Sequence, residues 1–170
     1  MSIRIELKGI TSIEADAVVN PANEALQEGG GVCGILFRAC GHRRELQKEC
    51  DRYGRCETGK AVITGAYDLK AKYIIHAVGP IWRGGKYNEA DLLYNAYKSS
   101  LTLAKEKGLK SIVFPLISAG IFMYPLEEAW SVAIEACKDF LEEYDIEIIF
   151  AVIDENIYNI GSVILKNIKM

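Results

Sequence analysis

Short β-rich runs and longer amphipathic runs alternate along the chain, and this order constrains the fold more than any other feature. The short runs predict strands over residues 3–7, 16–20, 61–64, 73–78, 111–114 and 146–153. Apolar residues at helical spacing predict helices over residues 31–41, 43–53, 89–107 and 126–144, and one that begins near residue 154. This alternation predicts an α/β fold, a three-layer α/β/α sandwich around a largely parallel sheet.

The length of 170 residues fits one domain, which we expect to span residues 1–170. Lys and Arg number 20 and Asp and Glu number 23, so the net charge of −3 disfavours a protein held on nucleic acid by a basic surface. Residues 1–8 alternate apolar with polar and form no signal peptide, and no run of about 18 apolar residues offers a membrane span. A cytoplasmic location is expected, and the sequence leaves the oligomeric state open.

The five cysteines form neither a disulfide framework nor a zinc signature, because their number is odd and no C-x-x-C pair occurs. Their positions are 33, 40, 50, 56 and 137. His42 and His76 do not complete a tetrahedral ligand set. We therefore expect reduced thiols, no metal site and no cofactor.

Two glycine-containing loops follow predicted strands. The first spans residues 20–34 and contains Gly29, Gly30 and Gly31, where the absence of side chains lets backbone N–H groups approach an anion at a helix start. The alternative is a flexible turn, since glycine is common in loops. The second loop spans residues 115–125 and again has small residues before a helix. Ligands bind beyond the carboxyl ends of parallel strands, so two such loops suit a diphosphate.

Residues 54–60 match the G-x-x-x-x-G-K pattern of a P-loop. A P-loop follows a strand, opens a helix and ends in a hydroxyl residue that holds magnesium. Here a charged helix precedes the motif, a strand follows it, and Ala61 lacks the hydroxyl. We therefore do not expect a nucleoside triphosphatase, and Lys60 is expected to face solvent.

Four motifs follow one another along the chain: VVNPAN at 18–23, GGGV at 29–32, YIIHAVGP at 73–80 and FPLISAGIF at 114–122. Together they resemble the macro domain family, over essentially the whole chain. The resemblance implies a mixed sheet of about six strands and a cleft for ADP-ribose, either free or attached to a protein. Some members of the family only bind this ligand. Others hydrolyse the ester between ADP-ribose and an acidic side chain, or deacetylate O-acetyl-ADP-ribose.

The resemblance also implies roles for individual residues. Asn23 would bond the distal ribose and is the candidate catalytic residue, Gly29–Gly31 would line that ribose, and Ser118–Phe122 would wrap the diphosphate with N–H groups. Phe122 packs beside the ribose or acts as an apolar lid, and Asn20 is expected to cap its strand. The predicted ligand-binding residues are Gly9, Ile10, Gly29, Gly30, Gly31, Val32, Cys33, Ser118, Ala119, Gly120, Ile121, Phe122, Ile153, Asp154 and Asn156.

Two positions depart from the family at the adenine end. Gly9 stands where the family has an Asp that accepts a hydrogen bond from the adenine amino group, and Ile153 stands where an aromatic ring stacks on adenine. Each lost contact is worth about 1 kcal/mol. Asp154 and Asn156 are candidates for substitute contacts. The sequence therefore leaves open the alternative that the ligand is not ADP-ribose.

A third departure concerns catalysis. The most active hydrolytic branch has an Asp and a His where this chain has Cys33 and Phe37. Cys33 is either a thiolate favoured by the helix N-terminus or a small apolar space-filler. Two functions remain: slow hydrolysis of ADP-ribosyl esters on protein or in O-acetyl-ADP-ribose, and binding of ADP-ribose or a related nucleotide diphosphate without turnover.

Overall fold

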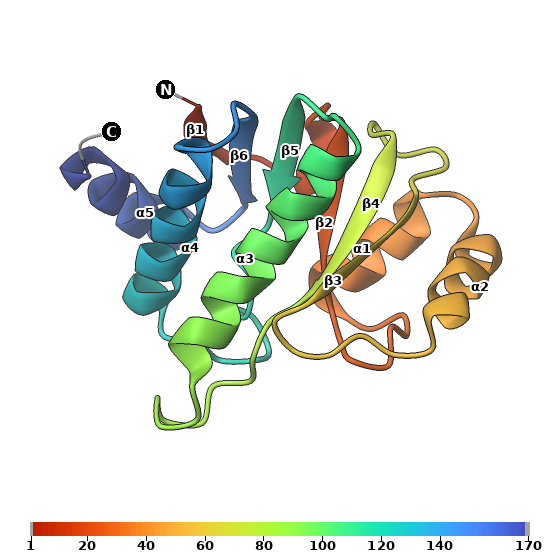
Figure 1. Cartoon of the computed structure of the whole chain (residues 1–170), viewed down its shortest axis with the longest axis horizontal. Helices are drawn as coiled ribbons and strands as arrows, with labels where there is room; N and C mark the ends of the chain where they lie inside the picture. Colours follow the sequence, from red (N-terminus) through yellow and green to blue (C-terminus); the bar gives the residue numbers. More distant parts are fainter. Residues whose placement is uncertain (1, 169–170) are drawn as a thin grey trace.

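The computed structural model describes residues 2–168, which build one six-stranded sheet between two layers of helices (Figure 1). The strands are β1 (Ile3–Leu7), β2 (Ala17–Ala22), β3 (Ala61–Gly65), β4 (Tyr73–Val78), β5 (Ser111–Phe114) and β6 (Glu147–Val152). Their order is β1-β6-β5-β2-β4-β3, and all neighbours are parallel except β3 and β4. The predicted mixed, largely parallel sheet is confirmed.

The second strand extends past its predicted end at residue 20 and includes Pro21. On one side β2 pairs with β4 throughout, whereas on the other side β5 reaches only Ala17 and Val18. From Val19 onward this second side has no partner strand, and proline is tolerated in such edge positions of a sheet. Proline therefore did not mark the strand end.

Helices α3, α4 and α5 cover one face of the sheet, and α1 and α2 cover the other (Figure 1). Their bounds are α1 (Gly31–Ala39), α2 (Arg43–Tyr53), α3 (Glu89–Glu106), α4 (Leu126–Leu141) and α5 (Glu155–Asn167), with a short 3-10 turn, η1 (Ile10–Ser12). Helix α4 ends before the predicted residue 144, because the N–H groups of Glu142 and Glu143 bond the carbonyls of Asp139 and Phe140 in a turn. Within residues 2–168 no helix has the length and apolar character needed to cross a membrane.

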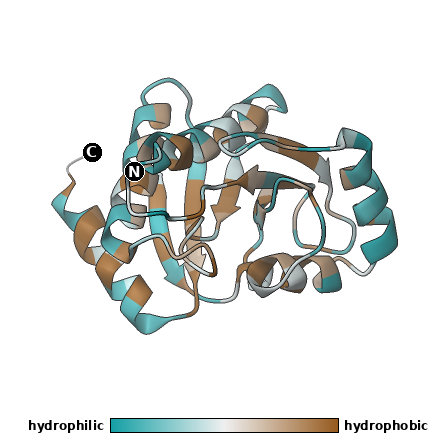
Figure 2. Cartoon of the chain, turned by 90° about the horizontal axis from the view of Figure 1, so that it is seen from below, coloured by the Kyte–Doolittle hydropathy of each residue, from teal (hydrophilic) through white to brown (hydrophobic). Residues whose placement is uncertain are grey.

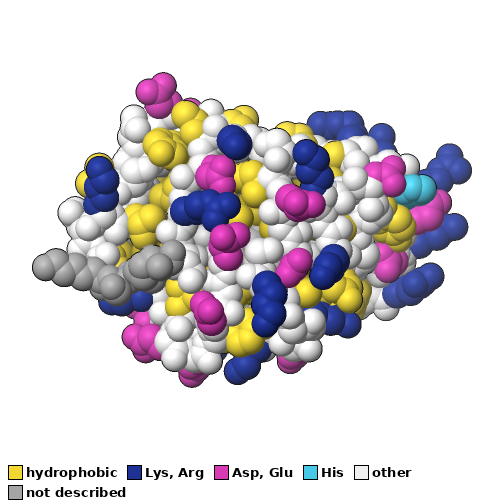
Figure 3. All heavy atoms as spheres, turned by 90° about the horizontal axis from the view of Figure 1, so that it is seen from above, with side chains coloured by type: hydrophobic (Ala, Val, Ile, Leu, Met, Phe, Trp, Pro, Cys, Tyr) yellow, Lys and Arg dark blue, Asp and Glu magenta, His cyan; other side chains and the backbone are white. Residues whose placement is uncertain are grey.

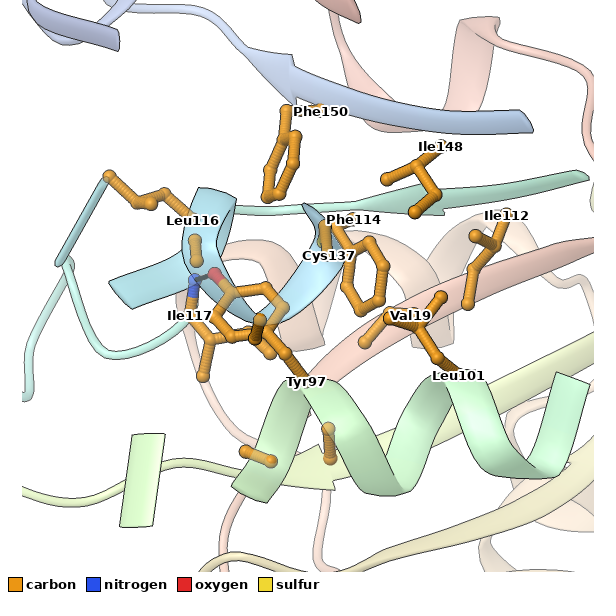
Figure 4. Packing of buried hydrophobic residues seen from close by; sticks show 14 of the residues in the cluster. Val19, Tyr97, Leu101, Ile112, Phe114, Leu116, Ile117, Cys137, Ile148 and Phe150 are labelled. Carbon is orange, nitrogen blue, oxygen red and sulfur yellow. Dashed lines mark hydrogen bonds between the residues drawn. The ribbon is translucent and has the colours of Figure 1, made fainter. Parts of the chain in front are cut away.

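Aromatic residues of the sheet and of the helices above it fill the core beneath α3 and α4 (Figure 4). The rings of Phe114 and Phe150 stack with centroids 5.6 Å apart, and Tyr97 of α3 lies 5.0 Å from Phe114. Burial of each such side chain contributes about 1.5–3 kcal/mol. The hydroxyl of Tyr97 also accepts a hydrogen bond from the N–H of Ile117 at 2.9 Å, so the core fixes the loop that follows β5 (Figure 4).

Strand β3 lies at one edge of the sheet, where α2 covers its outer side. The hydroxyl of Tyr53 donates to the carbonyl of Ile63 at 2.6 Å, and a carboxylate oxygen of Glu49 accepts from the N–H of Gly65 at 3.2 Å. Backbone groups that point away from β4 are thereby paired with side chains of α2.

The carboxyl ends of β1, β2, β5 and β6 meet at a single edge, which Figure 2 shows from below. The segments that follow these strands begin at Lys8, Asn23, Pro115 and Ile153. They include both glycine-containing loops and the two positions, Gly9 and Ile153, that depart from the family pattern at the adenine end. The topology therefore brings the predicted site residues to one edge.

Candidate functional site

A cavity of about 490 Å³ opens at this edge. Every predicted ligand-binding residue except Asn156 lines it, as does Asn23. Asn156 is exposed in the first turn of α5, and Ile157 takes the place beside the cavity. The lining residues that the sequence reasoning missed are Lys8, Thr11, Pro21, Ala22, Ile35, Pro115, Leu116, Ala151, Val152 and Ile157. Most of them lie within a few positions of a predicted residue in the sequence. This proximity was the one signal from which they could have been predicted.

The loop between β2 and α1 is closed by the Asn23 side chain. Its Nδ2 donates to the carbonyl of Gln27, and its Oδ1 accepts from the N–H of Gln27, both at 3.0 Å. Each polar atom keeps a second hydrogen or lone pair. Asn23 therefore shapes the loop and still has bonding capacity for a ligand.

The start of α1 presents unused N–H groups to the cavity. Gly30 is the N-cap and has no side chain to bond the first turn, so the N–H groups of Gly31, Val32 and Cys33 lack an intrahelical acceptor. Gly31 has φ of +58°, a left-handed conformation that glycine adopts without strain. A Cβ at Gly34 would approach the carbonyl oxygen of Gly29 to 2.7 Å, so only glycine lets the loop pack this closely on the helix. This helix start can receive an anion.

The loop after β5 offers a second set of donors. The hydroxyl of Ser118 donates to the carbonyl of Pro80 at 2.8 Å. The backbone carbonyl of Ser118 accepts from the N–H of Tyr124 at 2.9 Å. Among residues 2–168, no acceptor bonds the N–H groups of Gly120, Ile121 or Phe122. Ser118 thus holds the loop, while the following residues expose backbone donors of the kind that bind phosphate.

The end of the cavity beyond β1 and β6 is short of free acceptors. The carbonyl of Gly9 already accepts from the N–H of Ser12 at 3.0 Å and from its hydroxyl at 2.7 Å. Asp154 caps α5, since its Oδ1 accepts from the N–H of Ile157 at 3.0 Å. Ile153 is 77% exposed and presents an apolar surface. The capping bond occupies one oxygen of the carboxylate that was the candidate for a substitute contact.

Cys33 is nearly buried in the cavity floor and is a thiol. Its Sγ accepts from the N–H of Gly29 at 3.4 Å. Burial raises the pKa of the Cys33 thiol and outweighs the hydrogen bonds from Gly29 and Asn20 that lower it. Of the two alternatives for Cys33, burial therefore supports the small apolar space-filler over the thiolate. Phe37, one turn later, is 1% exposed and belongs to the core.

Asn20 does not cap its strand. It lies inside β2, is 2% exposed, and donates from Nδ2 to Nδ1 of His76 on β4 at 2.9 Å. Burial lowers the pKa of His76 to about 3, so the ring is neutral at physiological pH. Nδ1 accepts, so Nε2 carries the proton and donates to the hydroxyl of Thr64 at 2.9 Å. A buried chain of hydrogen bonds therefore joins β2, β4 and β3.

The motif that resembles a P-loop lies between α2 and β3, as the sequence predicted. Lys60 is exposed, and the N–H of Gly59 donates to the carbonyl of Val78 at 2.7 Å, so this amide is not available to a phosphate. Within the described chain, no group of three or more His, Cys, Asp or Glu side chains is arranged to hold a metal ion.

Comparison with known proteins identifies the family to which this fold and cavity belong. Residues 19–133 match the model of the Macro domain family. The chain belongs to the macro domain family. An O-acetyl-ADP-ribose deacetylase of Salmonella gallinarum is 45% identical to this macro domain over 152 residues, covering 86% of this chain and 84% of that protein.

Solved structures agree with this membership. The Oceanobacillus iheyensis macrodomain with ADP is 37% identical to this macro domain, with a TM-score of 0.89 over 96% of this chain and 90% of that chain. The Trypanosoma brucei macrodomain in complex with ADP-ribose is 35% identical, with a TM-score of 0.88 over 96% of this chain and 69% of that chain. The predicted family and fold are confirmed.

Proposed function

We propose that this macro domain binds ADP-ribose and its derivatives. One observation carries the proposal: two separate sets of unbonded backbone N–H groups, at 31–33 and 120–122, line one cavity. Two adjacent phosphates need such donors, and the positive end of the α1 dipole adds to their attraction. Related macrodomains have been crystallised with ADP and with ADP-ribose, which supports the same ligand class here.

In this arrangement the distal ribose lies between Asn23 and the glycines of the first loop. The amide of Asn23 contributes its second N–H hydrogen to a ribose hydroxyl. The adenine lies at the opposite end, against Ile10 and Ile153, where few acceptors are free. We therefore expect the diphosphate and distal ribose to contribute more to affinity than adenine.

We further propose that the chain slowly hydrolyses ADP-ribosyl esters on protein or in O-acetyl-ADP-ribose. Support comes from the related deacetylase of Salmonella gallinarum. The described cavity lining has no carboxylate at the start of α1, so the reaction would rely on a water molecule oriented by Asn23 and by backbone donors. A non-catalytic binding module is the second candidate, and the neutral, buried thiol of Cys33 favours it.

Calorimetry with ADP-ribose, ADP, AMP and ribose-5-phosphate tests the binding proposal. We expect ADP-ribose to bind most tightly and AMP much more weakly than ADP. Equal affinities for AMP and ADP-ribose would contradict this division of contacts. Release of ADP-ribose from a mono-ADP-ribosylated protein, and of acetate from O-acetyl-ADP-ribose, then decides between slow hydrolysis and binding alone.

A further inference from the structure

Helix α2 carries a row of three cations on its solvent face. Arg44, Lys48 and Arg52 recur every fourth residue, so they lie along the helix at intervals of roughly 6 Å. All three are exposed, and the buried residues of this helix, Leu46 and Cys50, lie on the opposite face. Figure 2 shows α2 as hydrophilic along nearly its whole length, and Lys and Arg side chains protrude at this end of the molecule in Figure 3.

The acidic residues of α2 contact groups other than this row. Glu49 bonds the hydroxyl of Tyr67 and the N–H of Gly65. Asp51 accepts from the side-chain amides of Gln27 and Gln47 at 3.0 and 2.9 Å.

The remaining acidic residue of this helix, Glu45, lies 3.8 Å from the His42 ring. Across residues 2–168, no carboxylate lies within 4.0 Å of the basic group of Arg44, Lys48 or Arg52. The three cations of this row are therefore not engaged in ion pairs within the described chain.

The neighbouring row of α2 is bound to the loop that leads into the cavity. Gln47 donates to the carbonyl of Leu26 at 2.8 Å and accepts from the N–H of Glu28 at 3.0 Å. Arg43 forms an ion pair with Glu28 at 2.7 Å. Since successive residues of a helix are rotated by about 100°, the cationic row lies directly beside this bound row. It therefore lies beside the loop segment that leads into Gly29, at the end of the cavity assigned to the distal ribose.

We propose that the Arg44, Lys48 and Arg52 row docks an acidic segment of the protein that carries the ADP-ribose group. This inference rests on the proposed function, because an attached protein leaves the cavity at its distal-ribose end. Esterification of an acidic side chain places the partner's own Asp- or Glu-bearing segment at that end. A row of about 12 Å matches a few carboxylates of an extended peptide. Nucleic acid is the less favoured partner, because three cations on a chain of net charge −3 neutralise few phosphates.

The test uses two peptides that are ADP-ribosylated on one Glu, with Asp or with Asn at the flanking positions. At low salt we expect the acidic peptide to bind the wild-type chain roughly tenfold more tightly than its Asn counterpart, and less so at high salt. The triple variant Arg44→Gln, Lys48→Gln, Arg52→Gln should remove this difference and leave the affinity for free ADP-ribose unchanged. The matched control changes Lys98, Lys105 and Lys110, exposed cations near the opposite face of the sheet, to Gln and should retain the difference.

Equal binding of the two peptides by the wild-type chain would overturn the docking proposal, as would equal losses in the two triple variants. In a competition experiment, an oligonucleotide and the unmodified acidic peptide are each tested for displacement of the ADP-ribosylated acidic peptide. Stronger displacement by the oligonucleotide would assign the row to nucleic acid instead. If free ADP-ribose does not bind, the proposed function fails. The row is then judged by the unmodified acidic peptide alone, whose binding must be salt-dependent and must be lost in the Arg44, Lys48 and Arg52 variant.

Discussion

Asn20 and His76 are 56 positions apart in the sequence, yet they stand directly opposite each other on β2 and β4 and share a buried hydrogen bond of 2.9 Å. The Oδ1 of Asn20 has no partner among the described residues, although it is buried. The amide of Asn20 also hydrogen-bonds the thiol of Cys33, and this bond lowers the Cys33 pKa against the larger effect of burial. A neutral His76 is thus hydrogen-bonded to Asn20, which in turn contacts Cys33 of the cavity lining.

The neutral state of His76 predicts a specific pH effect on stability. The ordinary pKa of His76 is 6.5 and burial lowers it to about 3, so between these values the unfolded chain binds a proton that the folded chain does not. Stability should fall as the pH falls through this window, by up to about 1.4 kcal/mol per pH unit. Urea unfolding of wild type and His76→Gln at pH 7, 5 and 4 isolates the contribution, since other groups cancel. The difference between the two should shrink as the pH falls. Parallel curves would show that His76 binds protons equally in both states.

Gly9→Asp should tighten binding of adenine nucleotides by at most about tenfold, since one hydrogen bond to a charged acceptor is worth around 1.5 kcal/mol. The backbone at Gly9 has φ of −65°, and a Cβ there meets no atom within 4 Å, so the new side chain causes no strain. Calorimetry should show the gain for AMP and ADP-ribose but not for ribose-5-phosphate, which lacks the base. No gain for either nucleotide would mean that adenine lies elsewhere.

Cys33→Asp should raise ester hydrolysis while changing ADP-ribose affinity little, because the carboxylate would act on water and the transition state. Cys33→Ala should leave any activity nearly intact, whereas Asn23→Ala should damage it by removing both loop-closing bonds. The assay is release of ADP-ribose from a modified protein, with Cys33→Asn as the uncharged control. Loss of activity in Cys33→Ala at unchanged stability would instead point to thiol chemistry.

Gly34→Ala should destabilise the chain by about 1–3 kcal/mol and weaken ADP-ribose binding, because the added methyl group displaces the carbonyl of Gly29. Gly30→Ala is the matched control for folding, since a Cβ at Gly30 meets no atom within 4 Å. Thermal unfolding should show a lower Tm for Gly34→Ala than for Gly30→Ala. Equal Tm values would show that the loop adjusts without cost.

Sequence patterns predicted the sheet and the two donor loops because both depend on local features. Strand runs, helix spacing and glycine clusters are encoded by neighbouring residues. Parallel topology then brings the loop after Ala22 and the loop after Phe114 to one edge. The register between strands is not local. Nothing near Asn20 in the sequence indicates that His76 faces it, so its role as a strand cap was the natural but wrong expectation.

Side-chain environments were likewise beyond the sequence. The position of Cys33 at a helix start was correctly predicted, but its protonation follows from burial, which depends on the packing of the whole layer. Asp154 was a candidate ligand contact, and the structure shows that one of its oxygens caps α5. Both cases required knowledge of what surrounds the residue.

Helix α2 both covers the exposed edge of the sheet and holds the loop that borders the cavity. Through Tyr53 and Glu49 it blocks the outer side of β3, and through Gln47 it holds the loop that borders the cavity. If α2 detaches, the edge of β3 becomes a template on which another chain can add a strand, and the cavity loses its border in the same event. Self-association and loss of ligand affinity should therefore appear together, at the same temperature or denaturant concentration, well before the sheet itself unfolds.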